Sequence, residues 1–145
     1  MKINKAKAIA RSMTRNYSNY DKIVNDLLEK KEEGSKKDVN SFIKSKNSIS
    51  SNTEIQAIKN LNIDNKISEI KEWKKIIDYA LEEAEKEYKY KGKALRYKFS
   101  NNMSSDMIAD IMTLSPSVLK SWSNEFILEI VILAVNKKII NLDRL

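Results

Sequence analysis

Residues that interrupt helices are almost absent from this chain. Its 145 residues include two glycines, Gly34 and Gly92, and one proline, Pro116. Glycine and proline are the least favourable residues inside a helix, and they mark most turns between strands. Alanine, leucine, isoleucine, glutamate and lysine, which favour helices or tolerate them, are spread along the whole chain. The sequence therefore predicts an all-α fold, a helical bundle with a long central helix.

The spacing of apolar residues predicts an amphipathic helix near the N-terminus. Its predicted buried face follows steps of three or four residues and consists of Ile9, Met13, Tyr17, Tyr20, Val24 and Leu27. We expect this helix to end near Gly34, because glycine is the commonest residue just past a helix end. The polar, basic residues 34–50 are predicted to be a linker. Residues 1–50 thus form the first predicted domain.

A second, stronger pattern follows and begins the predicted helical domain 51–145. Ser51 and Glu54 in the run SNTE have the spacing of a capping box, which predicts a helix start at Ser51. The long apolar stripe after it consists of Ile63, Ile67, Ile70, Trp73, Ile77, Leu81, Ala84 and Tyr88. Such a stripe packs inside a bundle or forms a coiled-coil dimer, and we expect the bundle.

Missing residue types exclude most enzyme classes. The chain has no histidine and no cysteine, so histidine-based triads, zinc hydrolases, haem sites and thiolate zinc sites are excluded. Two glycines are too few for a phosphate-cradling loop. Four clustered carboxylates alternate with Lys86 and Lys89 and indicate a solvated helix face; they are Glu82, Glu83, Glu85 and Glu87. We predict a protein that is not an enzyme and that needs no cofactor or metal.

The longest apolar run is FILEIVILAV, at residues 126–135. It contains a glutamate and is much shorter than the roughly 20 residues of a membrane span. The basic start, MKINKAKAIARS, has no apolar stretch of the signal-peptide kind behind it. We expect a cytoplasmic protein with no membrane partner. A helix that is apolar nearly all round must be buried. This run should therefore pack on the N-terminal helices or on a second copy of the chain, and we expect it to do both.

The charge balance suggests a polyanionic partner. The chain has 27 basic and 20 acidic residues, a formal charge of +7, and most of its basic residues are lysines. Lysine suits contacts with phosphate better than the bidentate reading of guanine. Between Lys86 and Phe99, basic residues that include Arg96 and Lys98 alternate with aromatic rings. We expect the rings to face inward and the basic groups to be available for phosphates.

Residues 104–124 have the spacing of a helix-turn-helix. Ser104 or Ser105 can cap the first helix, and Ser115 can cap the second, with Pro116 at its first position. Ala109 is the small residue that the helix crossing needs, whereas Thr113 occupies the turn position where glycine is usual. The side chains predicted to be buried are Ile108, Met112, Leu114, Leu119 and Trp122. The side chains predicted to face outward are Ser115, Pro116, Ser117, Lys120, Ser121 and Asn124.

Charge does not follow this motif. Residues 104–145 contain four basic and five acidic side chains, whereas residues 1–60 contain 13 basic and seven acidic ones. A DNA-reading segment with net charge −1 does not attract phosphates by itself. The phosphate contacts would then come from the basic N-terminal region and the stretch Lys86–Lys98, or from a partner such as RNA polymerase. A purely structural role for the motif is the remaining alternative.

Three stretches, in this order, resemble phage-encoded transcription regulators of the ArpU/RinA type. They are RNYSNYDKIVNDL at Arg15–Leu27, SNTEIQAIKNL at Ser51–Leu61 with the long helix that follows, and SDMIADIMTLSPSVLKSW at Ser105–Trp122. The last resembles that family's helix-turn-helix, which is akin to region 4 of sigma factors. The resemblance implies an activator of phage late genes in a bacterial host cell. Such a protein binds double-stranded promoter DNA in a sequence-specific way and acts with host RNA polymerase.

The expected DNA-binding residues follow from the motif and the resemblance. On the second helix they are Ser115, Ser117, Lys120, Ser121 and Asn124, and before it they are Arg96 and Lys98. The reading helix departs from the usual pattern because it lacks arginine. The alternative function is a helical phage assembly or adaptor protein, such as a small packaging subunit. In that case the stripe Ile63–Tyr88 and the apolar run drive oligomerisation.

Overall fold

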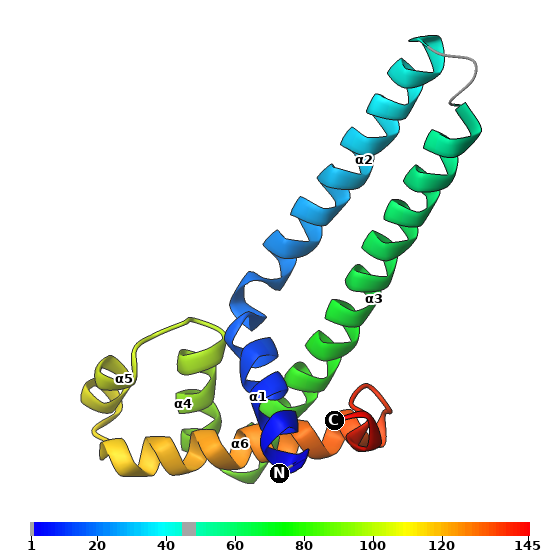
Figure 1. The fold of residues 1–145 in the computed structure, drawn as a ribbon. Helices are drawn as coiled ribbons and strands as arrows, with labels where there is room; N and C mark the ends of the chain where they lie inside the picture. Colours follow the sequence, from blue (N-terminus) through cyan, green and yellow to red (C-terminus); the bar gives the residue numbers. More distant parts are fainter. Residues whose placement is uncertain (1, 45–48) are drawn as a thin grey trace. The chain divides into compact units, whose positions relative to one another are not determined.

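The computed structural model describes the backbone of residues 2–44 and 49–145 and the side chains of residues 2–32 and 54–145. All regular structure in these residues is helical, which confirms the predicted all-α class. The helices are α1 (Lys2–Arg15), α2 (Tyr20–Lys44), α3 (Ile49–Glu87), α4 (Lys89–Phe99), α5 (Ser105–Met112) and α6 (Pro116–Asn136), with 3₁₀ turns η1 (Tyr17–Asn19) and η2 (Leu142–Arg144) (Figure 1). None of the described helices is long and apolar enough to cross a membrane.

The chain forms two compact units. The larger unit combines the residues up to Ser18 with Glu72–Leu145, and the smaller one is Asn19–Lys71. This division differs from the boundary at residue 50 that the sequence suggests. The reason is a contact between the two ends of the chain, because α1 packs against α6. Sequence spacing carries no signal for a contact over such a distance.

The smaller unit is an antiparallel helical hairpin of α2 and the first half of α3 (Figure 1). An ion pair joins the two helices, with 2.9 Å between the Lys31 Nζ and an Asp64 carboxylate oxygen. α2 continues through Gly34 to Lys44, so the predicted helix end and most of the predicted linker are wrong. One glycine costs a helix only about 1 kcal/mol, too little to end it by itself. α3 begins two residues before Ser51, whose side chain lies outside the described ones.

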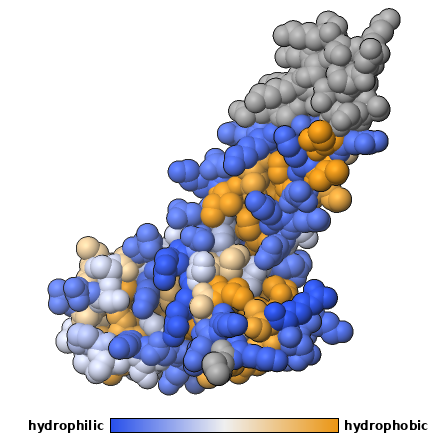
Figure 2. Space-filling model, in the orientation of Figure 1, coloured by the Kyte–Doolittle hydropathy of each residue, from blue (hydrophilic) through white to orange (hydrophobic). Residues whose placement is uncertain are grey.

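The described part of the hairpin leaves much apolar surface uncovered. Leu28, Ile55, Ile58 and Leu61 are exposed. Figure 2 shows apolar side chains gathered along the hairpin on the face it presents. Of the described side chains in this unit, Tyr20 and Ile67 are the buried apolar ones. The part of the hairpin whose side chains are described therefore has a thin core.

Small side chains form the buried face of α1, where α1 crosses α6 (Figure 1). Ala6, Ala10 and Thr14 are buried, and the Thr14 hydroxyl donates a hydrogen bond to the Ala10 carbonyl at 2.6 Å. Ile9, the first residue of the predicted apolar face, is 37% exposed. The predicted face is therefore wrong for α1, because close approach of two helices favours small residues at their contact. η1 also divides the predicted single helix in two.

The core of the larger unit lies between the end of α3, α1, α4 and α6. On α3 the predicted stripe is confirmed at its buried members Trp73, Ile77, Leu81 and Ala84. On α6 the buried residues include Phe126, Ile127, Ile130, Val131 and Ala134. Leu128 and Ile132, by contrast, are exposed, so the apolar run is not covered all round. Its expected packing against an N-terminal helix is confirmed by the contact with α1.

Candidate nucleic-acid interface

Helices α4, α5 and α6 form a three-helix cluster in which each helix contacts the other two. Its buried core consists of Ala94 on α4, Ile108 and Met112 on α5, and Leu119 on α6. Three of these residues belong to the predicted helix-turn-helix core, and Ala94 adds the helix that supports it. The motif is therefore held by tertiary packing as well as by its own turn.

The two helices of the motif begin at the predicted caps. The Ser104 hydroxyl oxygen accepts a hydrogen bond from the Met107 amide at 3.2 Å, at the start of α5. The Ser115 hydroxyl oxygen accepts from the Val118 amide at 3.3 Å, and Pro116 opens α6. Both hydroxyls satisfy amides that have no carbonyl partner inside the helix. These local signals are sufficient to set where each helix starts.

The turn between the helices depends on a left-handed residue. Thr113 has φ 54° and ψ 48°, and its amide donates to the Ala109 carbonyl. This conformation costs a residue with a Cβ about 1–2 kcal/mol, which explains why glycine is usual at this position. The packing of α5 and α6 maintains the turn in spite of threonine. The departure seen in the sequence thus leaves the helix-turn-helix geometry intact.

The first turns of α6 present an exposed polar surface. Ser115, Ser117, Lys120, Ser121 and Asn124 are all exposed, as predicted. The Ser115 hydroxyl is already engaged in the cap and lies 3.2 Å from the Ser117 hydroxyl. The remaining four residues, Ser117, Lys120, Ser121 and Asn124, are called the reading face below. Their hydroxyl, amide and ammonium groups can hydrogen-bond to base edges or to phosphates.

The aromatic rings of the stretch Lys86–Phe99, except that of Tyr88, pack against protein. Tyr90 and Tyr97 pack against the three-helix core. The Phe99 ring stacks on Phe126 with 5.1 Å between centroids. Tyr88 is exposed, but its ring meets Trp122 edge-on at 6.0 Å. The expectation that the rings face inward is therefore confirmed for Tyr90, Tyr97 and Phe99. It is wrong for Tyr88, which was also predicted to end the buried stripe and is exposed.

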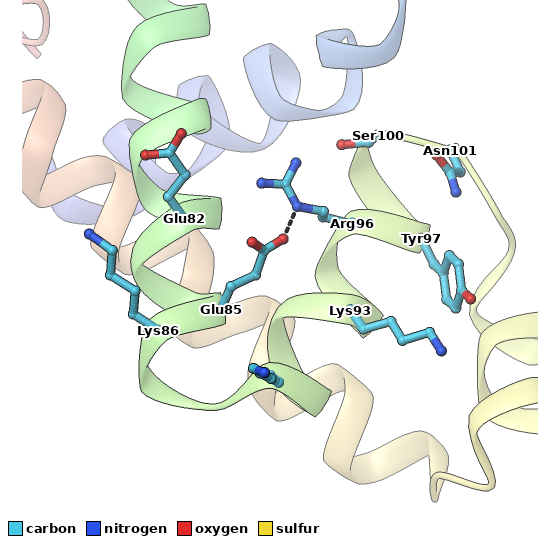
Figure 3. Close-up of a pocket in the computed structure, with 9 residues that line it drawn as sticks. Glu82, Glu85, Lys86, Lys93, Arg96, Tyr97, Ser100 and Asn101 are labelled. Carbon is cyan, nitrogen blue, oxygen red and sulfur yellow. Dashed lines mark hydrogen bonds and ion pairs between the residues drawn. The ribbon is translucent and has the colours of Figure 1, made fainter.

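Arg96 lies in a cleft between the end of α3 and α4 (Figure 3), and no residue of the reading face lines this cleft. This cleft has a volume of about 800 Å³ and is called the mixed cleft. Its charged lining residues are Glu82, Glu85, Lys86, Lys89, Lys93 and Arg96. The Arg96 Nε donates to the Glu85 carboxylate. The structure thus separates Arg96 from the other predicted DNA-binding residues and pairs its charge.

Lys98 lies in a second cleft, of about 330 Å³, together with Asn124 of the reading face. This cleft is called the basic cleft, because its charged lining residues are Arg11 and Arg15 of α1 and Lys98. The Lys98 Nζ donates to the Ser123 hydroxyl at 3.0 Å. No aspartate or glutamate lines it within the described part of the chain. Of the two predicted residues on α4, only Lys98 is therefore placed beside α6.

Burial alone lowers the pKa of Lys98. The cause is the loss of water around its ammonium group, because a neutral serine hydroxyl is the partner that receives its hydrogen bond. A desolvated ammonium group that has no carboxylate partner is stabilised when an anion approaches it. Among its described lining residues the basic cleft therefore has three cations and no carboxylate, whereas the mixed cleft has two carboxylates beside its four cations.

Sequence reasoning did not single out Arg11 and Arg15. It named the basic N-terminal region as one source of phosphate contacts, but no residue in it. The available signal was their spacing, since two of the chain's few arginines lie one helical turn apart. That spacing places both guanidinium groups on one side of α1, next to the buried Thr14.

Comparisons with known proteins give no relative for this chain. No family model, no curated protein and no solved structure matches it. In the described residues no group of three or more histidine, cysteine, aspartate or glutamate side chains could hold a metal ion.

Proposed function

We propose that this protein is a sequence-specific regulator of transcription that binds double-stranded DNA through α6. The single observation that carries the proposal is the combination of an ordered α5-turn-α6 motif with an exposed reading face of three neutral polar residues and one lysine. A helix of this kind fits the major groove when its first turns are polar and unobstructed. Of the reading face, only Lys120 is charged, so it would read bases mainly through neutral hydrogen-bonding groups.

The activating role is the finer part of the proposal. The resemblance of Ser105–Trp122 to a sigma-like helix-turn-helix supports promoter DNA as the target and host RNA polymerase as the partner. An activator of phage late genes should raise transcription from its own promoter in a reconstituted reaction with polymerase. Unchanged or reduced transcription, at protein concentrations that occupy the promoter, would contradict activation while leaving DNA binding intact.

The test of DNA reading begins with a selection of bound sequences from a random duplex library, using the full chain. The affinities of the selected duplex and a scrambled duplex are then measured for the wild type and for Lys120→Ala/Asn124→Ala. Each good base contact contributes about 1–3 kcal/mol of discrimination, so we expect the preference for the selected duplex to fall at least tenfold. Circular dichroism checks that the variant remains helical.

A matched control removes the same residue types elsewhere. Asn65 and Lys66 are exposed on α3. The variant Asn65→Ala/Lys66→Ala changes the net charge equally and should keep the preference of the wild type. A selection at low salt that enriches no sequence, or a reading-face variant that keeps full preference, would refute sequence-specific reading.

A second candidate function, a helical assembly or adaptor protein such as a small packaging subunit, is favoured by one observation. Ile55, Ile58 and Leu61 are exposed at three-residue spacing along α3. An apolar stripe of this spacing on one helix face is suited to contact with another helix. Light scattering of the full chain decides between the two. A ring of many subunits that Ile58→Lys dissociates supports assembly, and a monomer or dimer contradicts it.

A further inference from the structure

The basic cleft lies where four segments of the larger unit meet. α1 contributes Arg11 and Arg15, the end of α4 contributes Lys98, the start of α5 contributes Ser104, and α6 contributes Asn124. These residues lie up to 113 positions apart in the sequence, so the cleft exists only in the folded unit. Its volume of about 330 Å³ leaves room for a phosphodiester group.

Among the described residues no carboxylate pairs with the cations of this cleft, although the Lys98 ammonium also lies 5.6 Å from the centroid of the Phe99 ring. Neither Arg11 nor Arg15 forms an ion pair with any described residue, and both side chains are exposed. The half-buried Lys98 ammonium donates to the neutral Ser123 hydroxyl. In the mixed cleft, by contrast, Glu85 pairs with Arg96, and Glu82 is a second carboxylate in the lining. An anion entering the basic cleft meets three cations and displaces no carboxylate.

The remaining lining groups suit an oxyanion. Ser104 is the N-cap of α5, and the first amides of a helix have no carbonyl partner within it. Their partial positive charge adds to that of the guanidinium groups. Asn102 and Ser105 bring further hydrogen-bond donors to the same wall. The cleft thus combines guanidinium groups, an ammonium group and amides, which are the usual hydrogen-bond donors to phosphate in proteins.

The position of the cleft identifies the source of the phosphate. Asn124 belongs both to the reading face and to the lining of the cleft. Lys120 lies one turn before it on the same exposed side of α6. Because the two sites share Asn124, a duplex seated on the reading face would bring its backbone close to the cleft.

We propose that the basic cleft binds a backbone phosphate of duplex DNA, and that α1 is thereby part of the DNA interface. This inference rests on the proposed function and extends it to a named anchoring site. It accounts for a reading segment with no net positive charge of its own. The cations that hold the backbone come from the N-terminal helix and from α4, while α6 is left to read bases.

The test measures how Arg11→Gln/Arg15→Gln binds the selected and the scrambled duplex as the salt concentration varies. Both arginines are exposed, so we expect the fold to be retained. Losing one anchored phosphate should weaken both duplexes about tenfold at low salt. The slope of log affinity against log salt should fall in magnitude by about 1. The preference for the selected duplex should stay within twofold of the wild type.

The control variant Lys71→Gln/Arg144→Gln removes the same net charge at exposed positions outside the cleft. We expect it to change affinity by less than threefold and to leave the salt slope unchanged. If the Arg11/Arg15 variant matches either this control or the wild type, the proposed anchor is wrong. That outcome does not affect the reading-face test. Conversely, if only Lys120→Ala/Asn124→Ala gives the unexpected result and keeps the full preference for the selected duplex, sequence reading is overturned and the anchor stands.

A second arm separates DNA from a free phosphate. Inorganic phosphate and a short duplex are titrated separately into the full chain, and the amide resonances of Ser105 and Asp106 are followed by NMR. The proposal expects the duplex to shift both resonances in the wild type and not in Arg11→Gln/Arg15→Gln. Shifts caused by inorganic phosphate but not by the duplex would assign the cleft to a free phosphate ion and overturn the DNA anchor.

Discussion

The two clefts of the larger unit are built from the same basic stretch and differ in what faces it. Arg96 and Lys98 lie two residues apart on α4, and a helix turns by about 200° over that distance. Arg96 faces α3, where the Glu85 carboxylate pairs with it. Lys98 faces α6, beside a serine and the arginines of α1. A cluster of basic residues in a sequence is therefore a weak guide to an anion site until the neighbouring carboxylates are placed.

The largest expected effect concerns the core that holds the basic cleft and the reading face together. Leu119 is 1% exposed, and truncating it leaves a cavity between α4, α5 and α6. We expect Leu119→Ala to lower the free energy of unfolding by about 2–5 kcal/mol in urea denaturation. Val118→Ala, at a 38% exposed position of the same helix, should cost less than about 1 kcal/mol. Equal losses for the two would argue against this core.

The next effect concerns the crossing that forms the mixed cleft. A Cβ added to Gly92 on α4 would lie 2.7 Å from the Cα and 2.9 Å from the backbone nitrogen of Glu85. Backbone atoms cannot yield as a flexible side chain can. We therefore expect Gly92→Ala to destabilise the protein by about 1–3 kcal/mol in spite of alanine's higher helix propensity.

The matched control for this crossing is Lys93→Ala, the next residue along α4, whose side chain is exposed. This variant also places an alanine in the helix, but it adds no Cβ that would clash with a neighbouring backbone. Thermal denaturation should show a clear loss for the glycine variant and little change for the control. A stable Gly92→Ala protein would mean that α3 and α4 lie further apart than described.

A smaller change would make the two clefts alike. Glu85→Gln removes the carboxylate that pairs with Arg96, so the mixed cleft gains net positive charge. We expect a two- to threefold gain in affinity for scrambled duplex at low salt, measured by fluorescence anisotropy. The gain should vanish at high salt, because exposed charges are screened. Glu69→Gln, which makes the same charge change on the hairpin, should not raise the affinity for scrambled duplex at low salt. Equal gains would mean that only the net charge matters.

The smallest effect concerns an acidic group on α6 outside both clefts. Burial, together with repulsion from Glu87, raises the pKa of Glu129. When a carboxyl group has a higher pKa in the folded state than in the unfolded state, the folded protein loses stability as the pH rises from the lower pKa to the higher one. Glu129→Gln should thus raise the melting temperature at neutral pH by about 1–2 °C and give no gain below pH 4.

Its control on the same helix is Glu125, whose carboxylate lies 2.9 Å from the Lys91 ammonium. Removing a paired carboxylate should leave stability unchanged or slightly lower, so Glu125→Gln should differ from Glu129→Gln in sign. Melting curves from pH 4 to pH 8 measure both variants. A stability gain for Glu129→Gln that does not grow with pH would contradict the assigned cause.

Local features of the helix-turn-helix could be predicted from the sequence with good accuracy. Ser104, Ser115 and Pro116 stand at the expected helix starts, because caps depend on residues within one turn of each other. The outward positions of α6 were also predicted correctly, since helical periodicity alone places them. Thr113 looked like a departure, and its left-handed conformation shows that the turn tolerates it.

Longer-range features could not be predicted in the same way. The apolar face expected for α1 is wrong, because the neighbour of α1 is α6 and the contact selects Ala6 and Ala10. The helix end expected near Gly34 is wrong, because a single glycine is a weak local signal. In both cases the structure depends on more than the few neighbouring residues that a sequence pattern covers. For α1 it depends on a helix far away in the sequence, and for α2 on the total free energy of the helix.

The sequence by itself determined the all-α class, the helix starts of the motif and the polar character of the reading face. All three follow from backbone propensity, capping and periodicity, which act within a few residues. The tertiary structure alone decided which charges face one another. It paired Arg96 with Glu85 and brought Arg11 and Arg15 to Lys98 and Asn124. Electrostatic interaction depends on distance in space, and the packing of α1 on α6 sets that distance.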